Sequence, residues 1–241
     1  MLFALCTITP LVDQRDLYYI ARAVEIGARD CAKAWGLEPP AVEVCASPES
    51  LRPFCQPVIC TDKDDADTGF LAYHQADKFH GTLSRAFVKA ATGIFEGSAS
   101  LSESISHEVI EALVDPLCDL WTHMPGRPAG VLVAYEACDP VEDSYTVGYM
   151  DRDVQVSNFV YPSFFDDKLV DPQLAAKFMA AGGKFDHLGK LTRAGQIGPE
   201  GYAVFKDGSA TWLENDAGRM GASPRPGASH PAARTNRRLS A

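Results

Sequence analysis

The chain has 241 residues, of which 46% are hydrophobic and 22% are charged, and its formal net charge is −10 at pH 7. The length suits one globular domain of up to about 200 residues with an appendage. An acidic balance argues against nucleic acid as a partner. No apolar run approaches the roughly 18 residues of a membrane-spanning helix, so no membrane association is expected.

The charge is distributed unevenly along the chain. Residues 217–241 carry five arginines and no acidic residue, so the rest of the chain carries −15. This segment is rich in Gly, Ala, Ser and Pro and cannot bury enough apolar area to offset its chain entropy. We predict a disordered basic tail, with a solvated tail as the favoured interpretation. In a virion protein, the same tail would contact neighbouring subunits.

Cysteine usage and the N-terminus indicate the compartment. The seven cysteines are odd in number and form no C-x-x-C motif, which predicts buried free thiols in a reducing environment. Residues 1–12 are apolar but lack the basic start and long apolar run of a signal peptide. We therefore expect a cytoplasmic protein, or a virion protein if a phage encodes it.

The N-terminal half is predicted to run strand, helix, strand, strand, strand, helix. The first helix is expected over Asp13–Trp35, because apolar residues recur there at helical spacing and Gly36 follows. The four strands are expected over residues 2–9, 41–46, 69–74 and 83–90. His74 and His80 lie between the last two strands or at their ends. Either could approach a metal ion, but a lone polar residue at a strand end is the favoured interpretation of each.

Residues 47–67 are expected to form a loop because they contain three prolines and an acidic cluster. The spacing of these acids lacks the glycine and the terminal glutamate of an EF-hand, so a solvated turn is favoured over a calcium site. The cluster consists of Asp62, Asp64, Asp65 and Asp67.

The second helix, expected between Ser100 and Pro116, organises the rest of the prediction. Ser100 and Glu103 fit the capping-box pattern at its start. Pro116 ends it, because proline disfavours helical geometry in the residue before it. Five apolar residues at helical spacing are expected to face the core: Leu101, Ile105, Val109, Ala112 and Leu113.

A neighbouring stripe of this helix carries His107 and Glu111 one turn apart, with Glu108 between them in sequence. The pattern H-E-x-x-E differs by one residue from the H-E-x-x-H of zinc peptidases. There, two ligands a turn apart hold one metal, and the intervening glutamate acts as the base. Zinc accepts carboxylate oxygen, so Glu111 can replace the second histidine. The alternative interpretation is a solvated helix face.

A zinc site of this kind needs a third ligand from outside the helix. Glu136 and Asp139 directly follow a predicted strand and are the preferred candidates. Asp115 stays open as a ligand, a supporting residue or a helix-end residue, and Cys138 is more often a core residue than a ligand.

The second half of the chain is predicted to be rich in strands. They are expected over residues 131–135, 145–150, 154–160, 201–205 and 210–213, with a short helix over 172–181. The predicted fold class is α+β and zincin-like. A small twisted mixed sheet packs on the long N-terminal helix and the metal-bearing central helix. A single domain would cover residues 1–216, divided into 1–116 and the β-rich part 117–216.

Three segments carry a family resemblance: Ser106–Pro116, Tyr135–Asp143 and Val156–Asp166. They resemble uncharacterised proteins of bacteria and their phages that contain Ser-His-Glu-x-x-Glu, then Asp-Pro, then Glu-x-x-Asp. The first two segments are also similar to the core of the zincin-like exordium (phosphate-induced) proteins. The resemblance spans roughly residues 69–215.

The resemblance implies a zincin-like metallopeptidase that acts on a peptide or protein substrate. Carried over by position, the metal ligands would be His107 and Glu111 with Glu136 or Asp139, and Glu108 would be the base. Zinc is the expected cofactor, and calcium is a less favoured alternative. The alternative function is a non-catalytic phage virion or assembly protein that retains a structural metal site.

Overall fold

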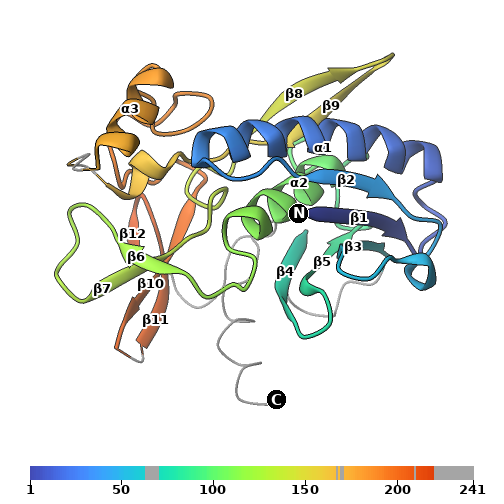
Figure 1. Ribbon diagram of the computed structural model, residues 1–241, viewed down its shortest axis with the longest axis horizontal. Coiled ribbons are helices and arrows are strands. Elements are labelled where there is room, and N and C mark those ends of the chain that lie inside the picture. Colours follow the sequence, from blue (N-terminus) through green and yellow to red (C-terminus); the bar gives the residue numbers. More distant parts are fainter. Residues whose placement is uncertain (63–70, 167, 169–170, 209, 220–241) are drawn as a thin grey trace.

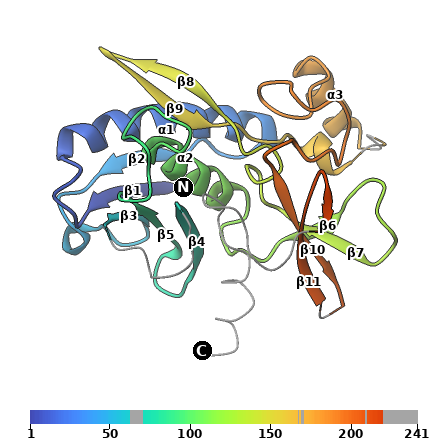
Figure 2. The same ribbon diagram turned by 180° about the vertical axis from the view of Figure 1, so that it is seen from behind.

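The computed structural model describes residues 1–62, 71–166, 168, 171–208 and 210–219. Within these residues, two five-stranded sheets lie on either side of the central helix α2 (Leu101–Val114), as Figures 1 and 2 show from opposite sides. The architecture is mixed α+β. No helix in the described part of the chain has the length and apolarity needed to cross a membrane.

The N-terminal sheet is mostly parallel. Its order is β2-β1-β3-β5-β4, in which β4 alone is antiparallel to its neighbour and lies at one end. The strands are β1 (Leu2–Thr7), β2 (Ala41–Val44), β3 (Gln56–Thr61), β4 (Ala72–Asp77) and β5 (Gly81–Phe87). Both β4 and β5 contact α2, so this end of the sheet lies beside the central helix.

Strand β3 corrects the expectation of a loop over residues 47–67. It occupies the middle of the sheet between β1 and β5, and all its residues except the half-buried Ile59 are buried. Covered on both faces, a parallel strand lacks the alternating pattern by which half-buried strands are recognised. Pro57 also argued against a strand. Strand β4 covers Ala72–Asp77, whereas the sequence predicted a strand over 69–74. Residues 69 and 70 lie outside the described part of the chain, as do Asp64, Asp65 and Asp67.

Helix α1 (Gln14–Trp35) runs across one face of the N-terminal sheet (Figure 1). Asp13 caps its start, because its carboxylate accepts the amide of Asp16 at 2.7 Å. Gly36, with φ of 71°, provides the left-handed residue at its end. The apolar residues that set its predicted period are all buried: Leu17, Ile20, Ala21, Val24 and Ala28.

Helix α2 begins and ends where the sequence predicts. The Ser100 hydroxyl accepts the amide of Glu103 at 3.1 Å, and Asp115 is the C-cap before Pro116. Every residue of the helix except Glu103 is buried, because α1, β4, β5 and β9 (Arg152–Ser157) all pack against it. The side chain of Thr82 in β5 also donates to the carbonyl of Pro116, which ties the helix end to the sheet.

The second sheet is antiparallel, with the order β12-β11-β10-β7-β6. Its strands are β6 (Trp121–His123), β7 (Val131–Ala134), β10 (Tyr202–Asp207), β11 (Ala210–Asn215) and β12 (Gly218–Arg219). Short β6 and β12 escaped the sequence prediction. A hairpin of β8 (Ser144–Tyr149) and β9 packs on α1, and α3 covers Pro172–Ala180. Two 3-10 helices cover Pro48–Ser50 and Pro162–Phe165.

All seven cysteines are buried and free, which confirms the prediction of unpaired thiols. The basic tail was predicted from residue 217. Residues 217–219 are part of the described structure, and the remainder of the tail lies outside it.

Candidate metal centre

Helix α2 brings the predicted ligand pair into the interior of the protein. The Nε2 atom of His107 lies 3.3 Å from Oε2 of Glu111, as expected for residues one helical turn apart. His107 is 5% exposed and Glu111 is fully buried, so the alternative of a solvated helix face is wrong. Two polar groups on a buried helix need partners, and the partners come from outside the helix.

The loop after β7 supplies one of those partners. Asp139 is fully buried, and its Oδ1 atom lies 3.1 Å from Nε2 of His107. Oε1 of Glu111 accepts the backbone amides of Cys138 and Asp139 at 3.2 and 3.3 Å. Glu111 of the helix therefore binds the backbone of the loop, and Asp139 of the loop places its carboxylate beside His107 of the helix.

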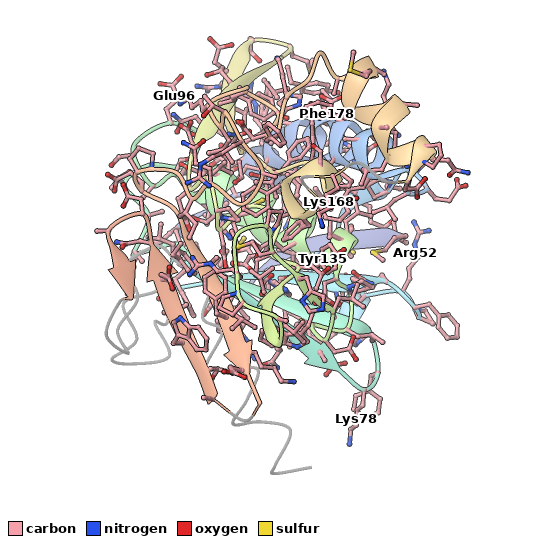
Figure 3. The ribbon with its side chains drawn as sticks, turned by 90° about the vertical axis from the view of Figure 1, so that its left-hand side faces the viewer. Arg52, Lys78, Glu96, Tyr135, Lys168 and Phe178 are labelled. Carbon is pink, nitrogen blue, oxygen red and sulfur yellow. The ribbon has the colours of Figure 1, made fainter. Side chains whose placement is uncertain are left out.

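Aromatic packing explains why the loop turns toward α2. Tyr135, the residue before it, has ring contacts with Trp35 and Phe165 at centroid distances of 5.6 and 4.7 Å. Tyr135 is half-buried, whereas Figure 3 shows Lys78, at the β4–β5 turn, pointing away from the protein. The amide of Tyr202 then binds the carbonyl of Asp139 at 2.9 Å, and its hydroxyl donates to Asp139 Oδ1 at 2.7 Å. Packing and hydrogen bonds thus fix both ends of the loop.

Glu136 belongs to the same loop but faces a different histidine. Its Oε2 atom is 4.0 Å from Nε2 of His74, a residue of β4. The four predicted metal ligands are therefore divided: Asp139 lies beside His107, Glu136 lies beside His74, and Glu111 lies between the two histidines. Asp115 stands at the helix end, where its carboxylate accepts the amides of Asp119 and Leu120 at 3.0 Å each.

His74 is the principal residue that sequence reasoning set aside. It lies within β4, is 5% exposed, and its Nδ1 atom is 2.6 Å from Oε2 of Glu108 and 3.7 Å from Oε2 of Glu111. The Cys118 thiol also forms a hydrogen bond with His74. The available signal was a histidine in one of the two strands that precede the central helix, and it gains meaning only once β4 is known to lie beside α2.

Two further residues were missed. Glu142 is half-buried and forms a cluster with His107 and Asp139 in which one ligand atom from each lies within 4.8 Å of the others. Tyr202, described above, is the tyrosine that reaches the cluster. Neither the acid nor the tyrosine has a distinctive spacing from the H-E-x-x-E motif.

The electrostatics of the centre favour positive charge. Burial lowers the pKa of His107, but Glu111 and Cys138 outweigh it and raise that pKa well above the usual range. Burial, together with Glu111, raises the pKa of Asp139 to about 8. Burial raises the pKa of Glu142 to about 8, although His107 opposes the shift. Protons bound at these groups are the species that a divalent cation would displace.

The donor set fits a divalent metal ion. Two groups each offer three ligand atoms within 4.8 Å of one another: His74, Glu111 and Glu136, and His107, Asp139 and Glu142. Imidazole nitrogen and carboxylate oxygen are both zinc ligands. All six residues are buried except Glu142, which is half-buried. We therefore describe a buried His and carboxylate cluster that can bind a metal ion.

Comparison of the chain with protein-family profiles, with curated proteins and with solved structures finds no match.

Proposed function

We propose that the protein is a zinc-dependent hydrolase of the zincin type that cleaves peptide bonds. His107, Glu111 and Asp139 would hold the zinc ion, and Glu108 would be the base. The observation that carries the proposal is the convergence of two carboxylates on one imidazole nitrogen. Oε2 of Glu111 and Oδ1 of Asp139 lie 3.3 and 3.1 Å from Nε2 of His107.

The arrangement of the N-terminal sheet supports the zincin-like part of the proposal. A zincin requires a small mixed sheet whose end strand lies beside the helix that bears H-E-x-x-H or its variant. Here β4 is antiparallel, lies at one end of the order β2-β1-β3-β5-β4, and contacts α2. A peptide substrate is commonly bound as an added strand at a sheet edge. We therefore propose that the substrate binds near β4.

Bound zinc would lower the pKa of a coordinated water toward about 7 and polarise the scissile carbonyl. Glu108 would accept the proton of that water and pass it to the leaving amine. His74 contacts Oε2 of Glu108 at 2.6 Å and would hold that carboxylate in place. Tyr202 would orient Asp139 through the hydrogen bond at 2.7 Å. Glu111 is an anion at the position where zinc peptidases have a neutral histidine, so it would make the zinc ion a weaker Lewis acid. We therefore expect slow turnover.

A second function is favoured by the burial of the cluster. Glu108 is 1% exposed and Asp139 is fully buried, and Glu142 adds another carboxylate beside His107. A structural zinc site is closed by four protein ligands, whereas a catalytic site keeps one position open. The alternative proposal is a non-catalytic assembly protein, such as a virion component, in which the metal stabilises the fold.

Metal content and peptide turnover measured on the same preparations separate the two proposals. For the hydrolase, the native protein contains zinc and cleaves a peptide library, and Glu108→Gln keeps the zinc but loses turnover by about 100-fold or more. Glu38→Gln, an exposed acid remote from the cluster in sequence, is the matched control and should behave as native. Zinc without turnover in any preparation supports the structural alternative. Absence of zinc contradicts both.

A further inference from the structure

We propose that the cluster binds a second divalent cation, held by His74, Glu136 and Glu111, next to the proposed zinc. This inference extends the proposed metal centre, because Glu111 belongs to both sites. It does not require that the protein hydrolyse peptides. The ligand class is a divalent transition-metal ion such as zinc, manganese or cobalt, which accept mixed imidazole and carboxylate ligands.

The first observation is that two donors outside the proposed zinc site, His74 and Glu136, form a set of three with Glu111. One ligand atom each from His74, Glu111 and Glu136 lie within 4.8 Å of one another, and all three residues are buried. Nε2 of His74 and Oε2 of Glu136 are 4.0 Å apart. Two ligands of a tetrahedral ion with bonds of about 2.1 Å lie about 3.4 Å apart, so a small inward movement would complete the site.

The second observation concerns the two oxygens of Glu111. Oε1 accepts the backbone amides of Cys138 and Asp139 and is thereby fixed on the loop. Oε2 lies 3.3 Å from Nε2 of His107 and 3.7 Å from Nδ1 of His74, the ring nitrogen that also contacts Glu108. This oxygen is therefore positioned between the two imidazoles, where it could bridge two cations. In two-metal hydrolytic sites the ions lie about 3.5–4 Å apart.

The third observation is that His74 has the supporting contact typical of a metal ligand. A ligating histidine usually binds a carboxylate, a carbonyl or a water through its other ring nitrogen. Here Nδ1 of His74 lies 2.6 Å from Oε2 of Glu108, and Nε2 faces Glu136. The contact fixes the ring so that Nε2 can bind a cation. Glu108 would thus support the second site as well as the first.

Charge balance favours two ions over one. Five carboxylates gather around the two imidazoles: Glu108, Glu111, Glu136, Asp139 and Glu142. With neutral imidazoles, and with all five carboxylates deprotonated by metal binding, one divalent cation would leave a formal charge of −3 in an interior where unpaired charge is costly, and two would leave −1. The second cation therefore neutralises charge that a mononuclear site leaves uncompensated.

Metal stoichiometry tests this inference directly. The full chain is stripped with a chelator, reconstituted with zinc, passed over a chelating resin and analysed for bound metal. We expect two zinc ions per chain for the native protein and one for Glu136→Gln, an isosteric change that leaves the proposed ligands of the first site intact. His74→Gln should also retain one ion. The exposed His123→Gln and Glu38→Gln variants should retain two.

Loading with manganese gives a readout that does not depend on counting. Two Mn²⁺ ions that share a carboxylate oxygen give an exchange-coupled electron paramagnetic resonance spectrum, and Glu136→Gln should convert it to the spectrum of an isolated ion. One zinc ion per native chain, or two zinc ions retained by folded Glu136→Gln, would overturn the inference. Two ions without peptide turnover would contradict the proposed hydrolase but support the second site. One ion with turnover would support the hydrolase and contradict the second site.

Discussion

Oε2 of Glu108 lies 2.6 Å from Nδ1 of His74, although the two residues are 34 positions apart in the chain. The contact joins the end strand of the N-terminal sheet to the central helix. It also links the proposed base to a histidine that the H-E-x-x-E motif does not include. Both side chains are buried, so neither can exchange this contact for water without a local opening of the structure.

We expect His74→Gln to lower peptide turnover by about 10- to 100-fold, a part of the contribution typical of a general base. The reason is that Glu108 loses the imidazole that orients it, while glutamine keeps a polar group in the buried space. Turnover of a peptide library by the zinc-loaded variants measures the effect. The exposed His123→Gln variant is the control, and equal turnover by the two variants would refute the supporting role.

Tyr202→Phe should lower zinc affinity by about 10-fold or more, because Asp139 loses the hydroxyl that donates to Oδ1 at 2.7 Å. In the metal-free protein the change should cost about 1–3 kcal/mol of unfolding free energy, since a buried polar contact is removed. Isothermal titration and urea unfolding measure the two effects. Tyr18→Phe removes an exposed hydroxyl and serves as the control. Unchanged affinity in Tyr202→Phe would contradict the account.

Gly27→Ala should destabilise the fold by about 1–3 kcal/mol, although alanine is the better helix former by about 1 kcal/mol. A Cβ atom at this position of α1 would lie 2.4 Å from Cγ1 of Val156 in β9. Urea unfolding measures the loss. Combining the change with Val156→Ala should recover part of it, because the clashing methyl group is removed. Strict additivity of the two changes would show that this contact is not the cause.

Glu103 gives the metal-free protein a pH-dependent stability. Burial raises its pKa to about 7 from the ordinary value of 4.5, although His107 and a backbone hydrogen bond from Ser100 oppose the shift. The folded state therefore binds this proton more tightly than the unfolded state, and stability falls as pH rises from about 4.5 to about 7. Glu103→Gln should abolish that part of the fall. The melting temperature of Glu103→Gln minus that of the native protein should increase between pH 5 and pH 8. A difference that stays constant over this range would refute the contribution of Glu103 to the pH dependence.

The sequence predicts the central helix well because its signals are local. Ser100 caps the first turn, and Pro116 directly follows the C-cap residue Asp115. Both boundaries are therefore encoded within a few residues of the helix itself. The spacing of His107 and Glu111 likewise depends only on helical geometry. Asp139 could be predicted as a candidate ligand because it comes directly after the next predicted strand. Only the folded loop shows that Asp139, and not Glu136, lies beside His107.

The features that escaped prediction depend on contacts distant in sequence. Strand β3 is buried on both faces by elements before and after it, which removes the alternation that a strand pattern needs. His74 becomes part of the buried His and carboxylate cluster only because β4 pairs with β5 and thereby lies against α2. Glu142 and Tyr202 reach the cluster through loop and sheet packing that has no fixed spacing from the motif.

The most direct test of the metal centre is an anomalous difference map recorded at the zinc edge from crystals of zinc-loaded protein. The account predicts a peak about 2.0–2.2 Å from Nε2 of His107, Oε2 of Glu111 and Oδ1 of Asp139. A map without a peak among these three atoms, from protein shown to carry zinc, would contradict it.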